Sequence, residues 1–260
     1  MAIITLTSDW GETDYYVASV KGRLLSLMPD IRIVDISHHI ALYDASHAAF
    51  VVKYAYPSFP EGTIHLIGVN SIAGIDSPHT VIKHEGHYFI GADNGILSLV
   101  CEGKPDEIAE IEIPSETKYF TFPSRDVFPR VAAVILSGKS IKDLGTPKKE
   151  LRTLMPFEPI VTDNRITGKI IHLDHYGNAI TNITEKLFRS FVKGKPFEIS
   201  LKSYPEGITE VSGSYDDVME GEKLALFGST GLLQIALNRG AGKELLGLRY
   251  DNSVMVTRKD

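Results

Sequence analysis

The chain has 260 residues, 43% of them hydrophobic and 23% charged, a balance typical of a globular protein with one large or two modest domains. Acidic residues outnumber basic ones, 33 to 27, and the resulting formal charge of −6 argues against a nucleic-acid partner. A single cysteine, Cys101, excludes an internal disulfide, is typical of a reducing compartment and is expected to be buried. Without a signal-like leader or an apolar run long enough to span a membrane, the sequence predicts a cytoplasmic protein with a small-molecule ligand and no membrane partner.

The first half of the chain alternates short apolar runs with longer amphipathic ones. The predicted strands are residues 2–6, 32–36 and 63–69, and the predicted helices are residues 16–28 and 45–56. This alternation is typical of crossover units, so we expect an α/β N-terminal domain with a largely parallel sheet over residues 1–148. Thr13 or Asp14 stands where the N-cap of the first helix is expected.

The middle of the chain changes character. Pro147, Pro156 and Pro159 lie among charged residues, and this composition predicts a linker over residues 149–166. The remainder, residues 167–260, predicts a smaller, mostly β domain with one helical stretch at residues 232–238. Its predicted strands are residues 169–173, 197–201, 223–227 and 253–257.

Two carboxylates, Asp9 and Asp14, lie in the sequence TSDWGETDYY, just beyond the first predicted strand. Ligands of open parallel sheets bind beyond the carboxyl ends of strands. A carboxylate there can accept both hydroxyls of a ribose, or bind a metal if further oxygen ligands converge. Asp14 can equally cap the next helix, whereas no helix start follows Asp9 at once. A second polar loop, residues 70–80, follows the strand at 63–69.

A second group of polar residues lies in HLDHYGNAITNI, residues 172–183. Asn178 offers a donor and an acceptor for a purine edge, and Tyr176 offers a stacking face close to Asp174. An ordinary hairpin turn around the glycine is the alternative. His172 and His175 point to opposite faces if they lie on one strand, and no third ligand is evident, so we expect no metal.

Ser124 lies in SRDVFPRVAAV, in a polar turn before an apolar run. Its hydroxyl suits either a helix N-cap or contact with a bound nucleophile, and no histidine in this stretch could activate it for covalent catalysis. Arg125 and Asp126 are expected to pair on the surface.

Two further features are less specific. The sequence GSTGLLQIALNRG, residues 228–240, lacks the lysine and spacing of a P-loop, although its hydroxyls and amides could hold a carboxylate. His38 and His39 follow a predicted strand and are expected to be exposed loop residues.

Six blocks taken in order resemble the S-adenosylmethionine hydroxide adenosyltransferase family, which also contains adenosyl-fluoride and adenosyl-chloride synthases. The resemblance spans most of the chain, and the blocks are TSDWGETDYYVASVKG, VDISHHIALYDASHAA, GADNGILS, TFPSRDVFPRVAAVILSG, GKIIHLDHYGNAITNI and LALFGSTGLLQIALNRGAGKELLG.

The resemblance implies an α/β domain followed by a β-barrel-like domain, in a homotrimer whose nucleoside sites lie between subunits. It implies displacement of methionine from the 5′ carbon of S-adenosylmethionine by water or a halide, without a cofactor or metal. Among the matching residues, Asp9 would accept the ribose hydroxyls and Tyr43 would line the pocket. The others implied to bind substrate are Asp14, Asp174 and Ser229 at the methionine end, Tyr176 and Asn178 at adenine, and Phe122.

The catalytic positions differ from the family pattern. Asn70 stands where hydroxide-transferring members carry an aspartate, no arginine follows it, and Pro123 stands at their histidine position. Phe122, Pro123 and Ser124 resemble instead the block that holds the halide-binding serine of halogenating members. Asn70 and Ser124 are therefore the candidate catalytic residues. Cleavage of S-adenosylmethionine by water is the leading hypothesis. The alternatives are a non-catalytic nucleoside binder, a halide adenosyltransferase and a metal-dependent phosphatase.

Overall fold

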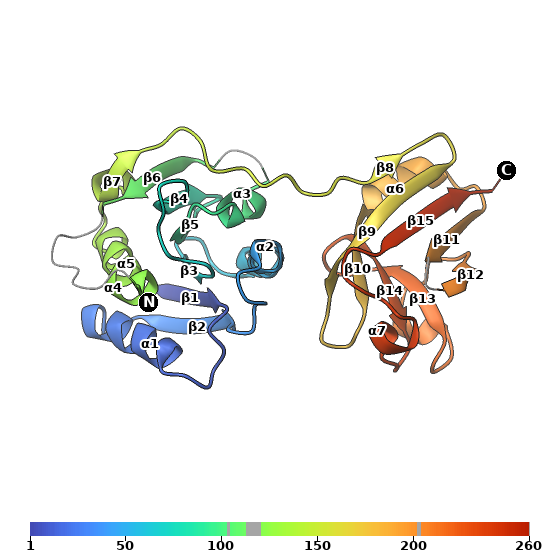
Figure 1. Cartoon of the computed structure of the whole chain (residues 1–260), viewed down its shortest axis with the longest axis horizontal. Helices are drawn as coiled ribbons and strands as arrows, with labels where there is room; N and C mark the ends of the chain where they lie inside the picture. The colour runs from blue at the N-terminus through green and yellow to red at the C-terminus, as the bar shows by residue number, and fades with distance from the viewer. Residues whose placement is uncertain (103–104, 113–120, 202–203, 260) are drawn as a thin grey trace. The chain divides into compact units, whose positions relative to one another are not determined.

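The chain is described here by a computed structural model that covers residues 1–102, 105–112, 121–201 and 204–259 (Figure 1). Internal contacts divide it into two compact units, Met1–Met155 and Pro156–Asp260. The division falls within the predicted linker, although β8 (Ile160–Val161) and the first residues of β9 (Arg165–Leu173) occupy part of that stretch. Each unit has its own sheet and its own buried core.

The N-terminal unit is built on one mixed sheet of seven strands in the order β2-β1-β3-β5-β4-β6-β7. Strands β2, β1, β3 and β5 are parallel, whereas β4, β6 and β7 join in antiparallel pairs. The predicted α/β fold with parallel strands is therefore confirmed. The strands are β1 Ile3–Ser8, β2 Arg32–Ser37, β3 Ile64–Gly68, β4 His79–His84, β5 His87–Ala92, β6 Glu107–Ile111 and β7 Gly145–Pro147.

Helices cover both faces of this sheet. Ile64 and Leu66 of β3 pack with α1 and α5 on one face, and Ile67 packs with α2 and α3 on the other, as the alternation of side chains along a strand requires. The helices are α1 Tyr16–Leu27, α2 Ala45–Ala55, α3 Ile96–Val100, α4 Pro123–Asp126 and α5 Phe128–Leu136, with 3₁₀ turns at Tyr56–Ser58 and Ile141–Leu144.

The strand order changes direction at β1. The chain goes from β1 to β2 on one side and then, through α2, to β3 on the other side. The crevice beyond the carboxyl ends of two such strands is the usual ligand site of an open α/β sheet. Asp9 directly follows β1, and Asn70 lies two residues beyond the end of β3. The topology thus places two predicted site residues at one edge of the sheet.

The C-terminal unit is an antiparallel, nearly closed sheet in the order β12-β11-β15-β9-β10-β14-β13, with β8 paired to β9. Its two end strands meet, since Lys223 Nζ lies 3.0 Å from Oε2 of Glu206. The predicted barrel-like β domain is confirmed. The remaining elements are β10 Ala179–Thr184, α6 Glu185–Val192, β11 Phe197–Leu201, β12 Tyr204–Ile208, a 3₁₀ turn Tyr215–Asp217, β13 Lys223–Phe227, β14 Leu232–Leu237, α7 Gly242–Leu245 and β15 Ser253–Arg258.

Two local predictions are wrong. Residues 232–238 contain strand β14 rather than a helix, because both faces of LLQIAL are buried and a continuous apolar run carries no readable period. Helix α1 begins at Tyr16 with Tyr15 at its N-cap and no side-chain capping bond, so neither Thr13 nor Asp14 caps it.

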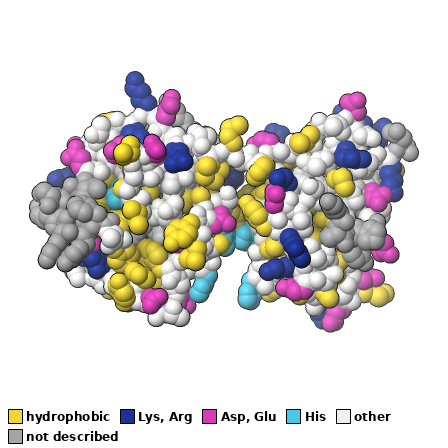
Figure 2. Space-filling view, in the orientation of Figure 1, with side chains coloured by type: hydrophobic (Ala, Val, Ile, Leu, Met, Phe, Trp, Pro, Cys, Tyr) yellow, Lys and Arg dark blue, Asp and Glu magenta, His cyan; other side chains and the backbone are white. Residues whose placement is uncertain are grey.

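The surface carries charges of both signs. Figure 2 shows acidic and basic side chains scattered over the visible face rather than gathered in one basic patch. Cys101 is buried, as expected, and burial raises the pKa of its thiol to about 12. Among the residues that the structure describes, every helix is too short or too polar to traverse a lipid bilayer.

Stability is expected to fall in mild acid because of a buried histidine on the α2 face of the sheet. His65 bonds to Thr5 at 2.7 Å, and burial together with His87 lowers the pKa of His65 to about 3. An unfolded chain protonates this group near its ordinary pKa of 6.5, so unfolding takes up a proton between the two values. The free energy of unfolding should fall by up to about 1.4 kcal/mol per pH unit below pH 6. Urea denaturation at pH 7.5 and 5 measures this, and His65→Gln should lessen the fall; an equal fall in that variant would contradict the assignment.

Candidate active site

Asp9 lies at the carboxyl end of β1 and is held from the loop that follows β2. One of its carboxylate oxygens, Oδ2, accepts the backbone N–H of Tyr43 at 3.0 Å. Tyr43 has a φ of 63°, a left-handed conformation that is rare for a bulky residue, and its side chain is exposed. Two predicted binding residues, 34 positions apart, are thus in direct contact.

Asn70 lies in a loop that is fixed through its backbone. Asn94 donates its side-chain amide to the carbonyls of Val69 and Asn70, each at 3.1 Å, and Asn70 has a φ of 44°. The next residue, Ser71, is buried. The amide side chain of Asn70 is exposed at the edge of the sheet, where it can donate and accept hydrogen bonds but cannot take a proton.

The two candidate catalytic residues are joined through Ser71. Ser124 Oγ donates to Ser71 Oγ at 3.1 Å, and both side chains are buried. His79 Nε2 lies 2.9 Å from the Ser71 carbonyl, which accepts its hydrogen; burial lowers the pKa of His79 and keeps it neutral. The alternative role of Ser124 as an N-cap is wrong, because Ser124 lies inside α4 and Phe122 is the capping residue.

An aromatic cluster connects the Asp9 loop with α4. The Trp10 and Tyr16 rings both meet the Phe122 ring edge-on, with centroids 5.4 and 5.3 Å apart. Arg125 lies over the Phe122 ring and pairs with Asp126 at 2.7 Å, as predicted, with both side chains partly exposed. Phe122 therefore belongs to the wall between Asp9 and Ser124. Asp14 lies in the exposed turn before α1.

In the C-terminal unit, the predicted adenine-binding residues form the turn between β9 and β10. The Asp174 carboxylate accepts the backbone N–H and the side-chain amide of Asn178, both at 2.9 Å, and Gly177 has a φ of 81°. Asn178 is buried and Tyr176 is 76% exposed. The hairpin-turn alternative therefore describes the backbone, while the Tyr176 ring is open to a stacking partner.

Sequence reasoning missed two polar residues of this unit. Gln234 Nε2 donates to Tyr215 Oη at 2.8 Å, and a Cβ on Gly228 would lie only 2.7 Å from Gln234 Oε1, which places Gln234 beside the turn that carries exposed Ser229. Burial raises the pKa of Tyr215 and the Asp174 charge adds to it, although the Gln234 bond opposes the shift. A buried glutamine in the apolar run LLQIAL was the available signal.

One of the two adjacent histidines, His38 and His39, lies in an environment other than the predicted one. His39 is exposed as expected, but His38 is 2% exposed, so that prediction is wrong. His172 lies in β9 and His175 in the exposed turn after it. No three His, Cys, Asp or Glu side chains among the described residues are grouped as ligands for a metal ion.

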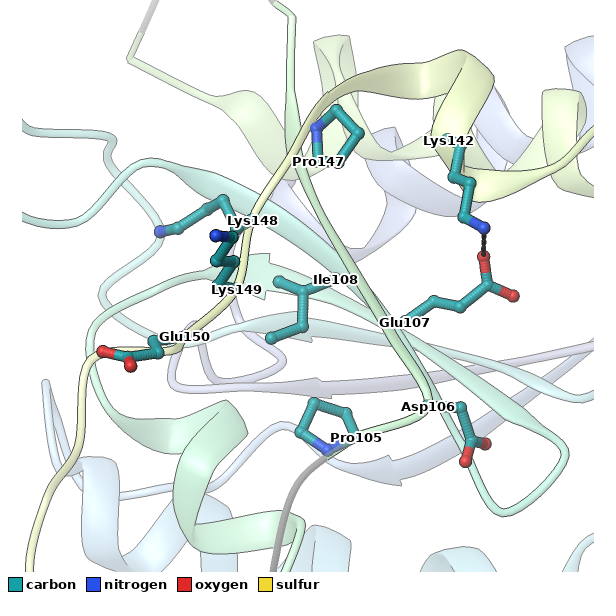
Figure 3. Close-up of a pocket in the computed structure, with 9 residues that line it drawn as sticks. All are labelled: Pro105, Asp106, Glu107, Ile108, Lys142, Pro147, Lys148, Lys149 and Glu150. Carbon is teal, nitrogen blue, oxygen red and sulfur yellow. Dashed lines mark ion pairs between the residues drawn. The ribbon is translucent and has the colours of Figure 1, made fainter.

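A cavity of about 390 Å³ lies elsewhere in the N-terminal unit, at β6 and β7 (Figure 3). Three lysines line it. Lys142 pairs with Glu107 at 3.8 Å, and Lys148 pairs with Asp93 at 2.7 Å. None of the predicted site residues lines this cavity, so it is not the candidate site.

The sequence and structure match known proteins over nearly the whole chain. The profile of the SAM hydroxide adenosyltransferase N-terminal domain matches residues 4–145, and that of the C-terminal domain matches residues 168–255. A Thermus thermophilus protein named (R)-S-adenosyl-L-methionine hydrolase is 30% identical, over 96% of this chain and 97% of the relative. A Nocardia brasiliensis protein named fluorinase is 27% identical, over 98% and 96%. The crystal structure of an uncharacterized conserved protein from Thermotoga maritima superimposes with a TM-score of 0.89 at 28% identity, over 98% of this chain and 100% of that one.

Proposed function

The chain belongs to the SAM hydroxide adenosyltransferase family, and on this premise we propose that it cleaves S-adenosylmethionine with water to give adenosine and L-methionine. The observation that carries the proposal is Asp9, a carboxylate held by the Tyr43 N–H at the point where the strand order changes direction. Such a carboxylate suits the two vicinal hydroxyls of a ribose.

The reaction is a direct displacement at the 5′ carbon. The water oxygen forms a bond to this carbon as the carbon–sulfur bond breaks, and the bonding electron pair leaves with sulfur as the neutral thioether of methionine. The attacking water loses one proton to solvent. Because a sulfonium is already a good leaving group, the protein has to align water with the carbon–sulfur bond and exclude competing water.

The residues near Ser71 fit this aligning role. We assign Asn70 to contact with the attacking water through its exposed amide, and Ser124 to holding the Asn70 loop in place, because its buried hydroxyl in α4 bonds Ser71, the next residue. Neither is a base at neutral pH, so we expect positioning rather than proton abstraction. Phe122 contributes an apolar wall that limits access of other water.

The rest of the site comes, in this proposal, from a neighbouring subunit of a homotrimer, without a cofactor. Asp14 and the partner's copies of four C-terminal residues would bind the methionine end and adenine, and these four are Asp174, Tyr176, Asn178 and Ser229. The exposure of Tyr176 supports this arrangement, since an aromatic face open to solvent suits stacking on a base. A single, buried cysteine supports a cytoplasmic location.

A non-catalytic nucleoside binder is the second candidate. It is favoured by Asn70 and by buried Pro123, which stand where the family's aspartate and histidine are expected and which cannot exchange protons. This candidate predicts adenosine binding without turnover.

Incubation with S-adenosylmethionine in ¹⁸O-labelled water separates the candidates. We expect adenosine that carries ¹⁸O at the 5′ oxygen, with an equal amount of methionine, measured by chromatography and mass spectrometry. Heat-treated protein is the control, and parallel samples contain chloride or fluoride. Calorimetric binding of adenosine without product would support the binder, and a 5′-halogenated nucleoside would support halide transfer.

A further inference from the structure

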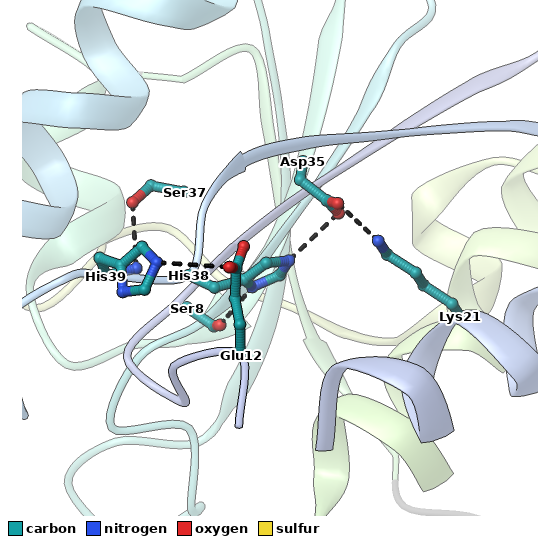
Figure 4. A network of polar contacts seen from close by, with 7 residues as sticks. All are labelled: Ser8, Glu12, Lys21, Asp35, Ser37, His38 and His39. Atoms are coloured by element: carbon teal, nitrogen blue, oxygen red, sulfur yellow. Dashed lines mark hydrogen bonds and ion pairs between the residues drawn. The ribbon is translucent and has the colours of Figure 1, made fainter. Parts of the chain in front are cut away.

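A chain of polar contacts runs from Lys21 and Asp35, which are partly exposed, to His38 and Ser8, which are buried at the end of β1 (Figure 4). His38 Nδ1 lies 2.7 Å from Ser8 Oγ, and His38 Nε2 lies 3.1 Å from Asp35 Oδ1, close enough for electrostatic attraction although no hydrogen bond forms there. Asp35 also pairs with Lys21 of α1. Burial alone would raise the pKa of Asp35, but the Lys21 and His38 contacts outweigh it and lower the pKa, which keeps the carboxylate charged.

The chain superficially resembles a serine nucleophile with its histidine and aspartate, but its geometry excludes that role. Ser8 is fully buried, so its hydroxyl cannot reach a substrate carbon. The Asp35 contact favours a hydrogen on His38 Nε2, so Nδ1 is left to accept the hydrogen of the Ser8 hydroxyl. The hydroxyl therefore acts as a donor that ties β1 to the imidazole.

His38 contacts the chain on both sides of Asp9. Its imidazole bonds Ser8, which precedes Asp9, and its carbonyl accepts the N–H of Gly11 at 2.8 Å. Between them, the Trp10 ring stacks on the imidazole, with centroids 6.2 Å apart and planes 16° from parallel. Three of the four residues Ser8–Gly11 thus contact His38, two through its imidazole and one through its carbonyl, and the fourth is Asp9 itself.

We propose that His38 is a positioning residue that fixes the direction of the Asp9 carboxylate for ribose binding; this inference rests on the proposed function. The Ser8 bond fixes the position of the last residue of β1. The Asp35–Lys21 pair, on the other side of the imidazole, fixes the tautomer and the plane of the ring. Loss of the Ser8 bond lets the Asp9 loop move and weakens nucleoside binding. The chemical step is less affected, because His38 touches neither Asn70 nor Ser124 in the contacts of the described residues.

Two substitutions distinguish the contact of His38 Nδ1 with Ser8 from the contact of Nε2 with Asp35. His38→Asn places an amide where Nδ1 lies and keeps a partner for Ser8, whereas His38→Gln reaches toward Asp35 and loses the Ser8 bond. We expect the Gln variant to bind adenosine about 10- to 100-fold more weakly and the Asn variant to bind within about threefold of wild type. The KM for S-adenosylmethionine should rise with the adenosine Kd, while kcat changes by less than about threefold. His39→Gln, at the exposed neighbour, is the matched control and should leave both values unchanged.

Trp10 is the single tryptophan of the chain, so its fluorescence reports this loop directly. In folded protein at 20 °C, His38→Gln should shift the Trp10 emission and His39→Gln should not. If His38→Gln does not fold, Asp35→Asn on the partly exposed arm replaces it, with a smaller loss of adenosine affinity expected. Equal adenosine affinity and emission in wild type and the Gln variant would overturn the positioning role while leaving the proposed function intact. Absence of adenosine binding to wild type would instead overturn the proposed function and this inference with it.

Discussion

Asp9→Asn is expected to weaken adenosine binding by about 100-fold or more while the protein stays folded. A hydrogen bond to a charged group contributes about 1.5–3 kcal/mol, and a ribose offers two hydroxyl donors to this carboxylate. The asparagine carbonyl can still accept the Tyr43 N–H, so the loop should keep its shape. The side-chain NH₂ of the asparagine, however, can only donate hydrogen bonds. The second ribose hydroxyl, which is itself a donor, therefore loses its acceptor. Isothermal titration with adenosine measures the loss directly.

Glu12→Gln is the control for this substitution. Glu12 lies in the same loop, is exposed and contacts only His39 at 3.6 Å among the ion pairs of the described residues, so the change removes an equal charge without touching the site. Adenosine affinity should stay within about twofold, since an exposed ion pair contributes little. Equal affinity of Asp9→Asn and wild type would show that Asp9 does not bind the ribose.

The sequence predicts the strands of this protein well where side chains alternate or where turn residues bound an apolar run. Residues 32–36 and 63–69 are predicted strands and nearly coincide with β2 and β3, because turn residues, Pro29 with Asp30 and Gly62, stand just before them. The prediction of a helix at residues 232–238 is wrong because this run shows no such alternation. It is buried on both faces in the closed sheet, and burial of this kind depends on β10 and β13, which lie beside it only after folding.

The candidate site is predictable in part, since Asp9 and Asn70 follow strands whose carboxyl ends must meet. The burial of His38 is not predictable in the same way. His38 and His39 are adjacent and identical, yet one is enclosed and the other exposed. The difference lies in contacts that exist only in the folded chain, since the His38 imidazole stacks on Trp10 and bonds Ser8 of β1. Two adjacent histidines carry no local signal that tells which of them makes these contacts.

The role of Ser124 shows a similar limit. A serine before an apolar run is a good N-cap on local grounds. In the folded chain its hydroxyl bonds Ser71, which is 53 residues away in sequence. The alternative that Ser124 belongs to the site therefore depends on a contact between α4 and the loop after β3, which exists only in the folded chain.

Gly68→Ala is expected to lower the free energy of unfolding by about 1–3 kcal/mol and to disturb the Asp9 loop. A Cβ at Gly68 would lie 2.2 Å from Cζ2 of the Trp10 ring, far inside van der Waals contact. The ring cannot easily move away, because it stacks on His38 on one side and meets Phe122 on the other. A displaced Trp10 must carry its neighbour Asp9 with it, so we also expect adenosine to bind about tenfold more weakly.

Gly91→Ala is the matched control, on the neighbouring parallel strand β5. A Cβ there would lie 3.4 Å from the nearest atom, the Ile67 carbonyl oxygen, which is an ordinary contact. Urea unfolding followed by circular dichroism and by Trp10 fluorescence measures both variants. Because both replace a strand glycine by alanine, their difference isolates the Trp10 clash from the general effect of a methyl group on the backbone. If the two variants unfold at the same urea concentration with wild-type Trp10 emission, then the ring is free to move and does not couple β3 to Asp9.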